Sequence, residues 1–179
     1  MQVRRFSHSD FQAIADIYNE SVARGGITMD RRFYGAEDIQ QWTKKFCDRE
    51  TILIAQQNHA IVGWAIIKRY SDRIGYRVAC ETSTYLSLSE TGKGYGSILQ
   101  VALLKQVINF GYHHIVAKIL TSNPDSIRFH QQFGFEVIGT QKEIGYYQGN
   151  WYDVAILQLV LSEVPPFCPN PSETLKTDP

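Results

Sequence analysis

Residues 81–99, ETSTYLSLSETGKGYGSIL, contain the segment that decides the fold. A strand-forming run ends near Ser87, a short loop follows, and a helix opens on three alternate glycines, Gly92, Gly94 and Gly96. Glycines let a backbone approach a ligand closely, and the free N–H groups of a helix's first turn point towards an anion. Lys93 and Ser97 add side-chain donors. The segment therefore predicts a phosphate-binding loop between a strand and a helix.

Two familiar phosphate-binding loops do not match this segment. A P-loop closes with Gly-Lys followed by Ser or Thr, which is absent here. A dinucleotide-binding loop lies in a parallel unit with an acidic residue about 20 residues further on, whereas this loop follows hairpin-like strands in mid-chain. Alone, the glycine pattern is as typical of an ordinary turn as of a ligand site, so the surrounding elements must decide.

The elements around the loop alternate between helices and strands. The helix after the glycines runs to about Phe110, and the nearly all-apolar run 114–120 predicts a strand covered on both faces. The remaining expected strands are 2–6, 51–57, 60–69, 76–87 and a closing hairpin of 135–144 with 151–161. One further helix is expected to begin at Ser9 or Asp10, one to span 36–46 and one to begin at Asn123. This order predicts an α/β (α+β) fold with a mixed sheet and helices on both faces. We expect one domain, 1–163, and a Pro-rich tail, 164–179, lying on the surface or disordered.

Composition narrows the classes of function. The 179 residues are 44% hydrophobic, and 18 basic residues balance 18 acidic ones, so no net field favours nucleic acid or an anionic membrane. No apolar run is long enough to span a bilayer, and the N-terminus has no apolar signal core. Three widely spaced cysteines indicate neither a disulfide framework nor a metal site. We therefore expect a cytoplasmic protein without a metal, a nucleic-acid partner or a membrane partner.

Two segments together resemble a known family. Residues 81–99 resemble the acetyl-CoA motif of GCN5-related N-acetyltransferases (GNAT), in which a bulged strand precedes a pyrophosphate-binding loop. Residues 122–136, SNPDSIRFHQQFGFE, are similar to the family's second cofactor segment. The resemblance implies the GNAT fold, mostly antiparallel, and acetyl-CoA as co-substrate. It implies a cofactor site made of Thr84, Tyr85, Leu86, Gly92, Lys93, Gly94, Tyr95, Gly96, Ser97, Asn123 and Ser126.

Finer matches point to one branch of this family. IYNESV at 17–22, the segment Tyr76 to Glu81 and GYYQGNWYDVAILQL at 145–159 resemble the phosphinothricin and methionine-sulfone acetyltransferases. The resemblance implies N-acetylation of a small amino-acid-like acceptor, and we also expect a homodimer. Thr91 replaces the usual Arg or Gln at the head of the loop, which removes a charge-assisted contact of about 1.5–3 kcal/mol. Residues 25–30 also depart from the branch, and this region borders the acceptor pocket.

The reaction requires an acid–base group because an aliphatic amine is mostly protonated at neutral pH. Glu81 is the candidate general base, with a structural ion pair to Arg73 or Arg77 as the alternative. His130 stands where the superfamily commonly has a tyrosine that protonates the leaving thiolate, so it is the second candidate catalytic residue. Cys80, next to Glu81, is better explained as a buried strand residue than as a nucleophile.

The acceptor is defined less closely by the sequence. Arg73, Tyr76, Arg77 and Glu81 are candidate substrate-binding residues, since guanidinium groups match a carboxylate or phosphinate. A peptide N-terminus or a polyamine is an alternative acceptor, and a catalytically silent acetyl-CoA sensor is an alternative function.

Overall fold

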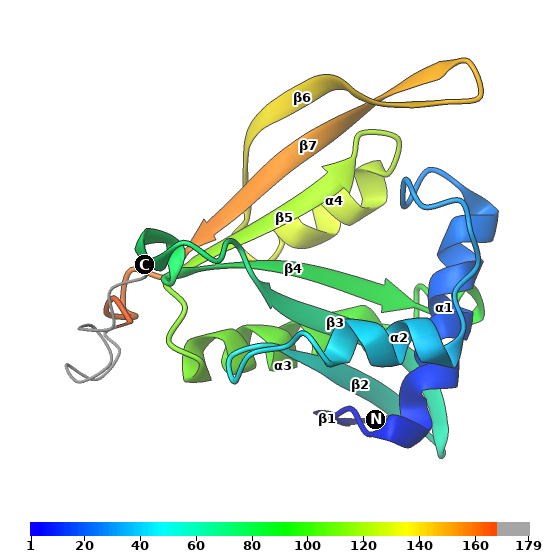
Figure 1. Cartoon of the computed structure of the whole chain (residues 1–179), viewed down its shortest axis with the longest axis horizontal. Coiled ribbons are helices and arrows are strands. Elements are labelled where there is room, and N and C mark those ends of the chain that lie inside the picture. The colour runs from blue at the N-terminus through cyan, green and yellow to red at the C-terminus, as the bar shows by residue number, and fades with distance from the viewer. Residues whose placement is uncertain (168–179) are drawn as a thin grey trace.

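The computed structural model describes residues 1–167, which form a seven-stranded mixed sheet with helices on both faces (Figure 1). The strand order is β1-β2-β3-β4-β5-β7-β6. The strands are β1 (Gln2–Arg5), β2 (Thr51–Gln57), β3 (Ala60–Arg69), β4 (Ala79–Leu86), β5 (His114–Leu120), β6 (Glu136–Tyr147) and β7 (Asn150–Val160). The helices are α1 (Phe11–Arg24), α2 (Ala36–Thr43), α3 (Tyr95–Asn109) and α4 (Pro124–Gln131). The expected α/β fold with a mostly antiparallel sheet is confirmed.

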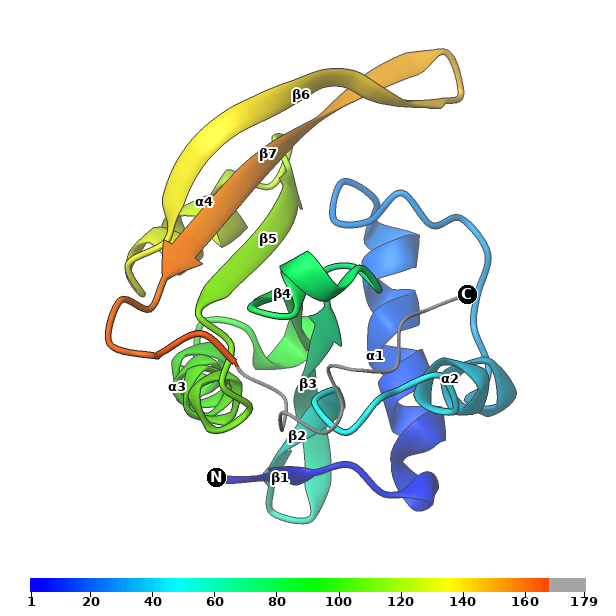
Figure 2. The same ribbon diagram turned by 60° about the vertical axis from the view of Figure 1, so that its left-hand side comes forward.

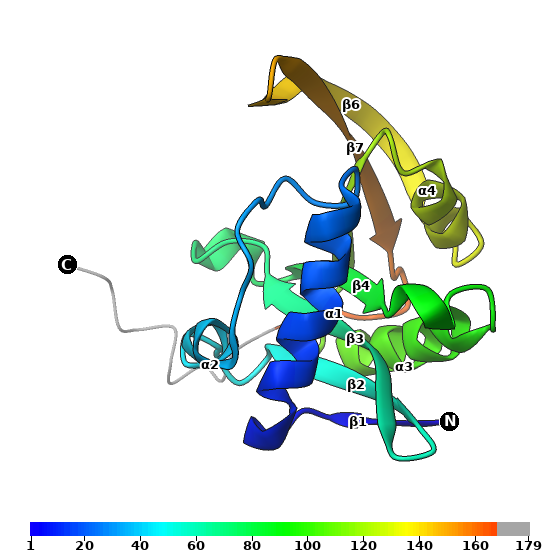
Figure 3. The same cartoon turned by 90° about the vertical axis from the view of Figure 1, so that its right-hand side faces the viewer.

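Two hydrophobic cores lie on opposite faces of the sheet. Helices α1 and α2 cover one face, and Ile14, Ile39 and Trp64 are almost fully buried there. Helix α3 covers the other face with Leu99, Leu103 and Val107, none of which is exposed. In Figure 2, α3 lies on one side of β2 and β3 and α1 and α2 lie on the other, and Figure 3 shows α1 crossing in front of these strands. Alternating strand residues therefore divide between two cores, which fixes the register of the central strands.

The hairpin of β6 and β7 extends beyond the rest of the sheet as a long arm, coloured yellow to orange in Figure 2. Strand β6 is longer than the expected 135–144, and β7 is displaced by one residue from the expected 151–161. The turn between them contains Gln148 and Gly149, both with positive φ. Two consecutive residues of positive φ are typical of a type I′ hairpin turn, whose twist matches that of the strands it joins.

Three local expectations were wrong. The strand expected over 76–87 begins at Ala79, because residues 74–76 form a short 3₁₀ turn that carries Tyr76 and Arg77 away from the strand. The bulge implied for β4 is absent from its pairing with β3, whose register runs unbroken from Gly63↔Leu86 to Arg69↔Cys80. Strand β5 is covered by the core on the face of Ile115 and Ala117, whereas its other face lines a cavity.

Part of the expected tail lies outside the described residues, namely 168–179, including Cys168. The preceding residues pack against the body, where the Val164 carbonyl accepts a hydrogen bond from His113 Nδ1 at 2.7 Å. None of the helices within residues 1–167 is both long and apolar enough to cross a membrane.

Candidate active site

The site begins where β4 and β5 separate. These two strands run parallel and pair from Ala79↔His114 to Glu81↔Val116, and no pair follows. Strand β4 nevertheless continues to Leu86 and β5 to Leu120, so the facing backbone edges beyond Glu81 have no strand partner. Figure 1 shows the two strands diverging towards α1. Unpaired edges in the middle of a sheet are free to hydrogen-bond an extended ligand.

A cleft of about 580 Å³ lies at the open end of this split. Its walls come from the end of α1, from β4, from the glycine loop and from the start of α4. Eight of the predicted site residues line it: Thr84, Tyr85, Leu86, Gly92, Gly96, Asn123, Ser126 and His130. Lys93, Gly94, Tyr95 and Ser97 belong to the same loop and first helical turn but do not line the cleft in the part of the chain described.

The glycine loop is built as an open cradle. Gly92 and Gly94 have φ of +77° and +82°, and a Cβ added to either would meet no heavy atom within 4 Å. Gly94 is the N-cap of α3. Among the hydrogen bonds of residues 1–167, none uses the backbone N–H groups of residues 92–96. The loop thus presents unsatisfied donors and room for a ligand at a helix N-terminus, which suits a phosphate group.

Nearby side chains are arranged around this cradle rather than in it. Thr91 Oγ1 donates to the Leu88 carbonyl at 2.8 Å, so its hydroxyl closes the preceding turn. Lys93 Nζ lies 3.0 Å from Glu90 Oε1 in an exposed ion pair. Tyr95 packs its ring against the core under α3. The backbone N–H groups are therefore the donors that this loop leaves free.

Helix α4 forms the opposite wall of the cleft. Asn123 caps the helix by accepting a hydrogen bond from Ser126 N–H at 3.3 Å, and Pro124 occupies the first helical position. One turn later His130 is 5% exposed, with its ring against Phe129 and Phe135. Its Nδ1 lies 2.8 Å from the Ser126 carbonyl, so Nδ1–H is the donor and Nε2 is left as an acceptor.

The electrostatics of His130 follow from this burial. Desolvation lowers the pKa of the imidazole below its ordinary 6.5, and the hydrogen bond to the Ser126 carbonyl offsets part of that effect. The ring is therefore neutral at neutral pH. A neutral imidazole with a free Nε2 is better suited to accepting a proton than to donating one.

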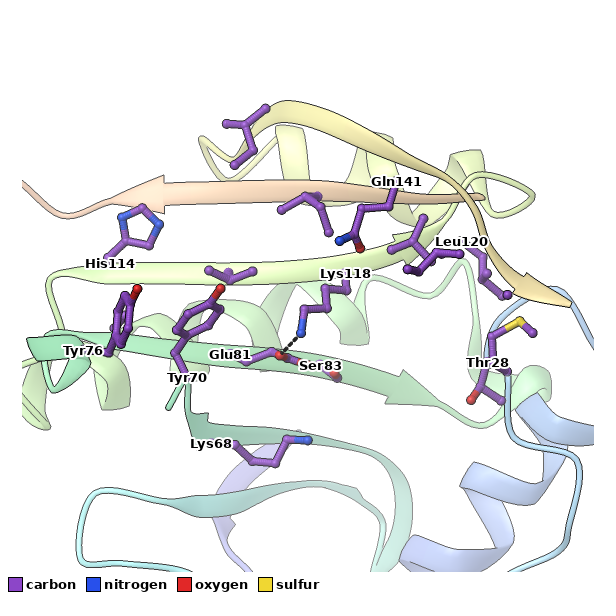
Figure 4. Close-up of a pocket in the computed structure, with 18 of the residues that line it drawn as sticks. Thr28, Lys68, Tyr70, Tyr76, Glu81, Ser83, His114, Lys118, Leu120 and Gln141 are labelled. Atoms are coloured by element: carbon purple, nitrogen blue, oxygen red, sulfur yellow. Dashed lines mark hydrogen bonds and ion pairs between the residues drawn. The ribbon is translucent and has the colours of Figure 1, made fainter. Parts of the chain in front are cut away.

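A larger cavity of about 1120 Å³ lies on the other side of the split. Its floor is the face of β4 and β5 that carries Glu81, Ser83, Val116 and Lys118, and the β6–β7 arm forms a wall (Figure 4). Residues 27–29, next to the end of α1, also line it. The departures from the branch pattern within 25–30 therefore fall partly at this cavity and partly at the cleft, which Gly25 and Gly26 line.

Glu81 is held in this cavity by a lysine. Its Oε2 accepts a hydrogen bond from Lys118 Nζ at 2.7 Å, drawn as the dashed line in Figure 4. The two side chains are 22% and 46% exposed, respectively, so both remain accessible from the cavity. The expected alternative pairing of Glu81 with Arg73 or Arg77 is wrong, because the strand begins after these arginines and Lys118 stands across the split.

Tyr85 connects the two spaces. Together with Ile27 it lines both the cleft and the cavity, and its ring stacks on Trp64 with centroids 4.4 Å apart. Burial raises the pKa of its phenol to about 12, so the hydroxyl is protonated at neutral pH. The cleft with His130 and the cavity with Glu81 therefore meet at a tyrosine that holds a proton.

The predicted acceptor residues separate in space. Tyr76 lines the cavity beside Tyr70, with ring centroids 5.6 Å apart. Arg77 instead lines a different cavity, where its carbonyl accepts from Arg49. Arg73 is exposed and lines none of the cavities described for residues 1–167. The structure thus brings Tyr76 to Glu81 and leaves both arginines away from it.

Sequence reasoning missed Lys118, and a signal was available. In HIVAKIL, residues 114–120, one lysine interrupts a run expected to be buried. A charged residue at such a position requires either a partner or an opening to solvent, and here it has both. Within the described residues, no group of three or more His, Cys, Asp or Glu side chains is arranged to hold a metal.

Known proteins that are similar to this chain are acetyltransferases. The model of the acetyltransferase (GNAT) domain matches residues 3–156. A phosphinothricin N-acetyltransferase of Streptomyces coelicolor is 29% identical over 87% of this chain and 93% of its own length. An L-methionine sulfoximine/L-methionine sulfone acetyltransferase of Salmonella typhimurium is 29% identical over 91% and 96%. A putative acetyltransferase from Salmonella typhimurium, solved with its cofactor acetyl-CoA, superposes with a TM-score of 0.86 at 28% identity, covering 96% of this chain and 98% of that one. The chain belongs to the GNAT acetyltransferase family.

Proposed function

We propose that this acetyltransferase transfers the acetyl group of acetyl-CoA to the amino group of a small amino-acid-like acceptor. The observation that carries the proposal is the pair of spaces on either side of the β4–β5 split. A cleft with a phosphate cradle and a cavity with a carboxylate meet at Ile27 and Tyr85. Two reactants entering from opposite sides would meet there, as a direct transfer requires.

The cleft residues fit coenzyme A. The free N–H groups of 92–96 would hold the pyrophosphate, and Asn123 and Ser126 would border it from α4. The unpaired edge of β4 at Thr84, Tyr85 and Leu86 would hydrogen-bond the pantetheine arm. When bound, acetyl-CoA supplies an activated thioester; everything else in the reaction falls to the residues of this chain.

The acid–base roles follow from position. Glu81 Oε1 makes no hydrogen bond within the described residues, so it is available to take the proton of the acceptor's ammonium, directly or through a water. His130 lines the cleft, and the bond from its Nδ1 leaves Nε2 as an acceptor. Tyr85 lines both spaces and keeps its phenol protonated, and a neutral phenol can donate a proton to a leaving thiolate. We propose Glu81 as general base and His130 as a second proton-handling residue.

The alternatives differ in what they require of the cavity. A polyamine site would be lined with carboxylates, but among residues 1–167 this cavity is lined by Lys68 and Lys118 and by one acidic residue, Glu81. A silent sensor would have no need for an accessible carboxylate in a cavity that adjoins the cofactor cleft. Both observations favour catalysis on an acceptor that is not purely cationic.

A thiol-release assay tests the function. Purified protein is given acetyl-CoA and, separately, amino acids, methionine sulfone, phosphinothricin, a short peptide and a polyamine. We expect release with amino-acid-like acceptors above the rate with peptide or polyamine. Binding of acetyl-CoA without thiol release in the presence of any amine would establish the sensor instead. Faster turnover of the peptide or the polyamine would make that compound class the acceptor in place of amino acids.

We also propose that the chain forms a single domain over 1–163 and works as a homodimer in the cytoplasm. The β6–β7 arm supports the dimer because it carries exposed apolar side chains. Ile138, Ile144 and Tyr146 on the edge strand β6 are each more than half exposed, and so is Trp151 on β7. Light scattering on the wild type and on Trp151→Lys measures the association. The free thiols of Cys47 and Cys80 agree with a reducing compartment.

A further inference from the structure

Lys118 lies in the proposed active site, but the proposed acetyl transfer gives it no role. It stands on a central strand among apolar neighbours, and its side chain reaches across the split to Glu81 at 2.7 Å. An ion pair this exposed contributes little to the stability of a fold, because water screens the two charges. Stability alone is therefore a weak reason for a lysine at this position.

The pair retains unused hydrogen-bonding capacity on both members. An ammonium has three donors, and one of them is spent on Glu81 Oε2. Glu81 Oε1 makes no hydrogen bond within residues 1–167. The Tyr70 ring, 6.0 Å from Nζ, lies beside the lysine at the same end of the cavity (Figure 4). A donor and an acceptor of opposite charge thus face the same space.

This arrangement matches the charges of an amino acid. An α-amino acid carries its ammonium and its carboxylate on one carbon, so the ammonium can meet Glu81 while the carboxylate meets Lys118. A peptide N-terminus offers a neutral carbonyl instead of the carboxylate, and a polyamine brings a second positive charge towards the lysine.

We propose that Lys118 binds the α-carboxylate of the acceptor and is thereby the residue that selects free amino acids over peptides and simple amines. This inference rests on the proposed function. It assigns to Lys118 the role that the sequence suggested for Arg73 or Arg77, neither of which lines the cavity.

Three variants test the assignment. Lys118→Met keeps the length of the side chain and removes its charge, while Lys118→Arg keeps the charge. Lys68→Met is the matched control, because Lys68 lines the same cavity and stands opposite Glu81 in the β3–β4 register but makes no ion pair with it within the described residues. Each enzyme is assayed with the best amino acid of the panel and with its C-terminal amide, and the readout is the ratio of the two kcat/KM values.

The wild type should prefer the acid over the amide by about 10- to 100-fold, the worth of one charged hydrogen bond. Lys118→Met should abolish this preference by raising KM for the acid, Lys118→Arg should restore part of it, and Lys68→Met should keep it. Equal loss of kcat on acid and amide in Lys118→Met would overturn the inference, since it would mean that Lys118 only orients Glu81. A wild type that acetylates both acceptors equally would also overturn it, whereas a wild type inactive on every amine would contradict the proposed function itself. Unchanged acetyl-CoA affinity in each variant verifies folding.

Discussion

Replacing Gly94 by alanine should weaken acetyl-CoA binding far more than it weakens the fold. Gly94 is the N-cap of α3, with φ of +82°. The chain provides a matched control in Gly149, which has φ of +79° in the β6–β7 turn. A Cβ at either position meets no heavy atom of the protein within 4 Å.

The two substitutions therefore impose the same backbone strain. A left-handed non-glycine residue costs about 1–2 kcal/mol, which lowers the melting temperature of a domain of this size by roughly 2–8 °C. At Gly94 a methyl group also enters the space above the free N–H groups of 92–96. Losing one or two charged hydrogen bonds of about 1.5–3 kcal/mol each should raise the Kd for acetyl-CoA at least 10-fold.

Calorimetric titration with coenzyme A and thermal unfolding of both variants measure the two effects separately. We expect similar melting temperatures for Gly94→Ala and Gly149→Ala, and a raised Kd in the former alone. A folded Gly94→Ala protein that binds coenzyme A like the wild type would refute the placement of the pyrophosphate.

Three further outcomes follow from the site. Glu81→Gln should keep acetyl-CoA affinity and lower kcat by about 10²–10⁴-fold, with partial recovery at high pH as the acceptor loses its proton unaided; a normal kcat at neutral pH would exclude the base role. Glu90→Gln should lower the Kd for acetyl-CoA by a few-fold, because it removes a negative charge beside the cradle and frees Lys93; the gain should shrink in high salt, and an affinity independent of Glu90 would contradict this. Because burial lowers the folded-state pKa of His130 below 6.5, the unfolded chain binds more protons as the pH falls below that value, and stability falls with it. Urea titrations should accordingly show that His130→Gln loses less free energy of unfolding than the wild type between about pH 7 and pH 5. An identical loss in both proteins would contradict the lowered pKa of His130 in the folded state.

Local patterns predicted most elements to within a few residues. Glycine and asparagine act on the backbone conformation of their immediate neighbours. They therefore predict the helix after the glycine loop and the helix cap at Asn123. The start of β4 was misjudged because 76–78 alternate like a strand, yet the chain turns at 74–76 before it reaches the sheet. The end of α2 at Thr43 was likewise missed, although Phe46 still packs against the same core.

The candidate site was predictable in its parts and not in its assembly. The sequence alone determined the glycine cradle and the mixed fold, because positive φ, helix capping and hydrophobic periodicity depend on neighbours along the chain. Its resemblance to the family was carried by two motifs, 81–99 and 122–136. The tertiary structure alone decided that β4 and β5 part after Glu81, that Lys118 meets Glu81 across that split, and that Arg73 and Arg77 stay away from the cavity. Residues 81 and 118 are joined by a through-space contact between two strands, and no local pattern encodes which strands pair or where their pairing ends.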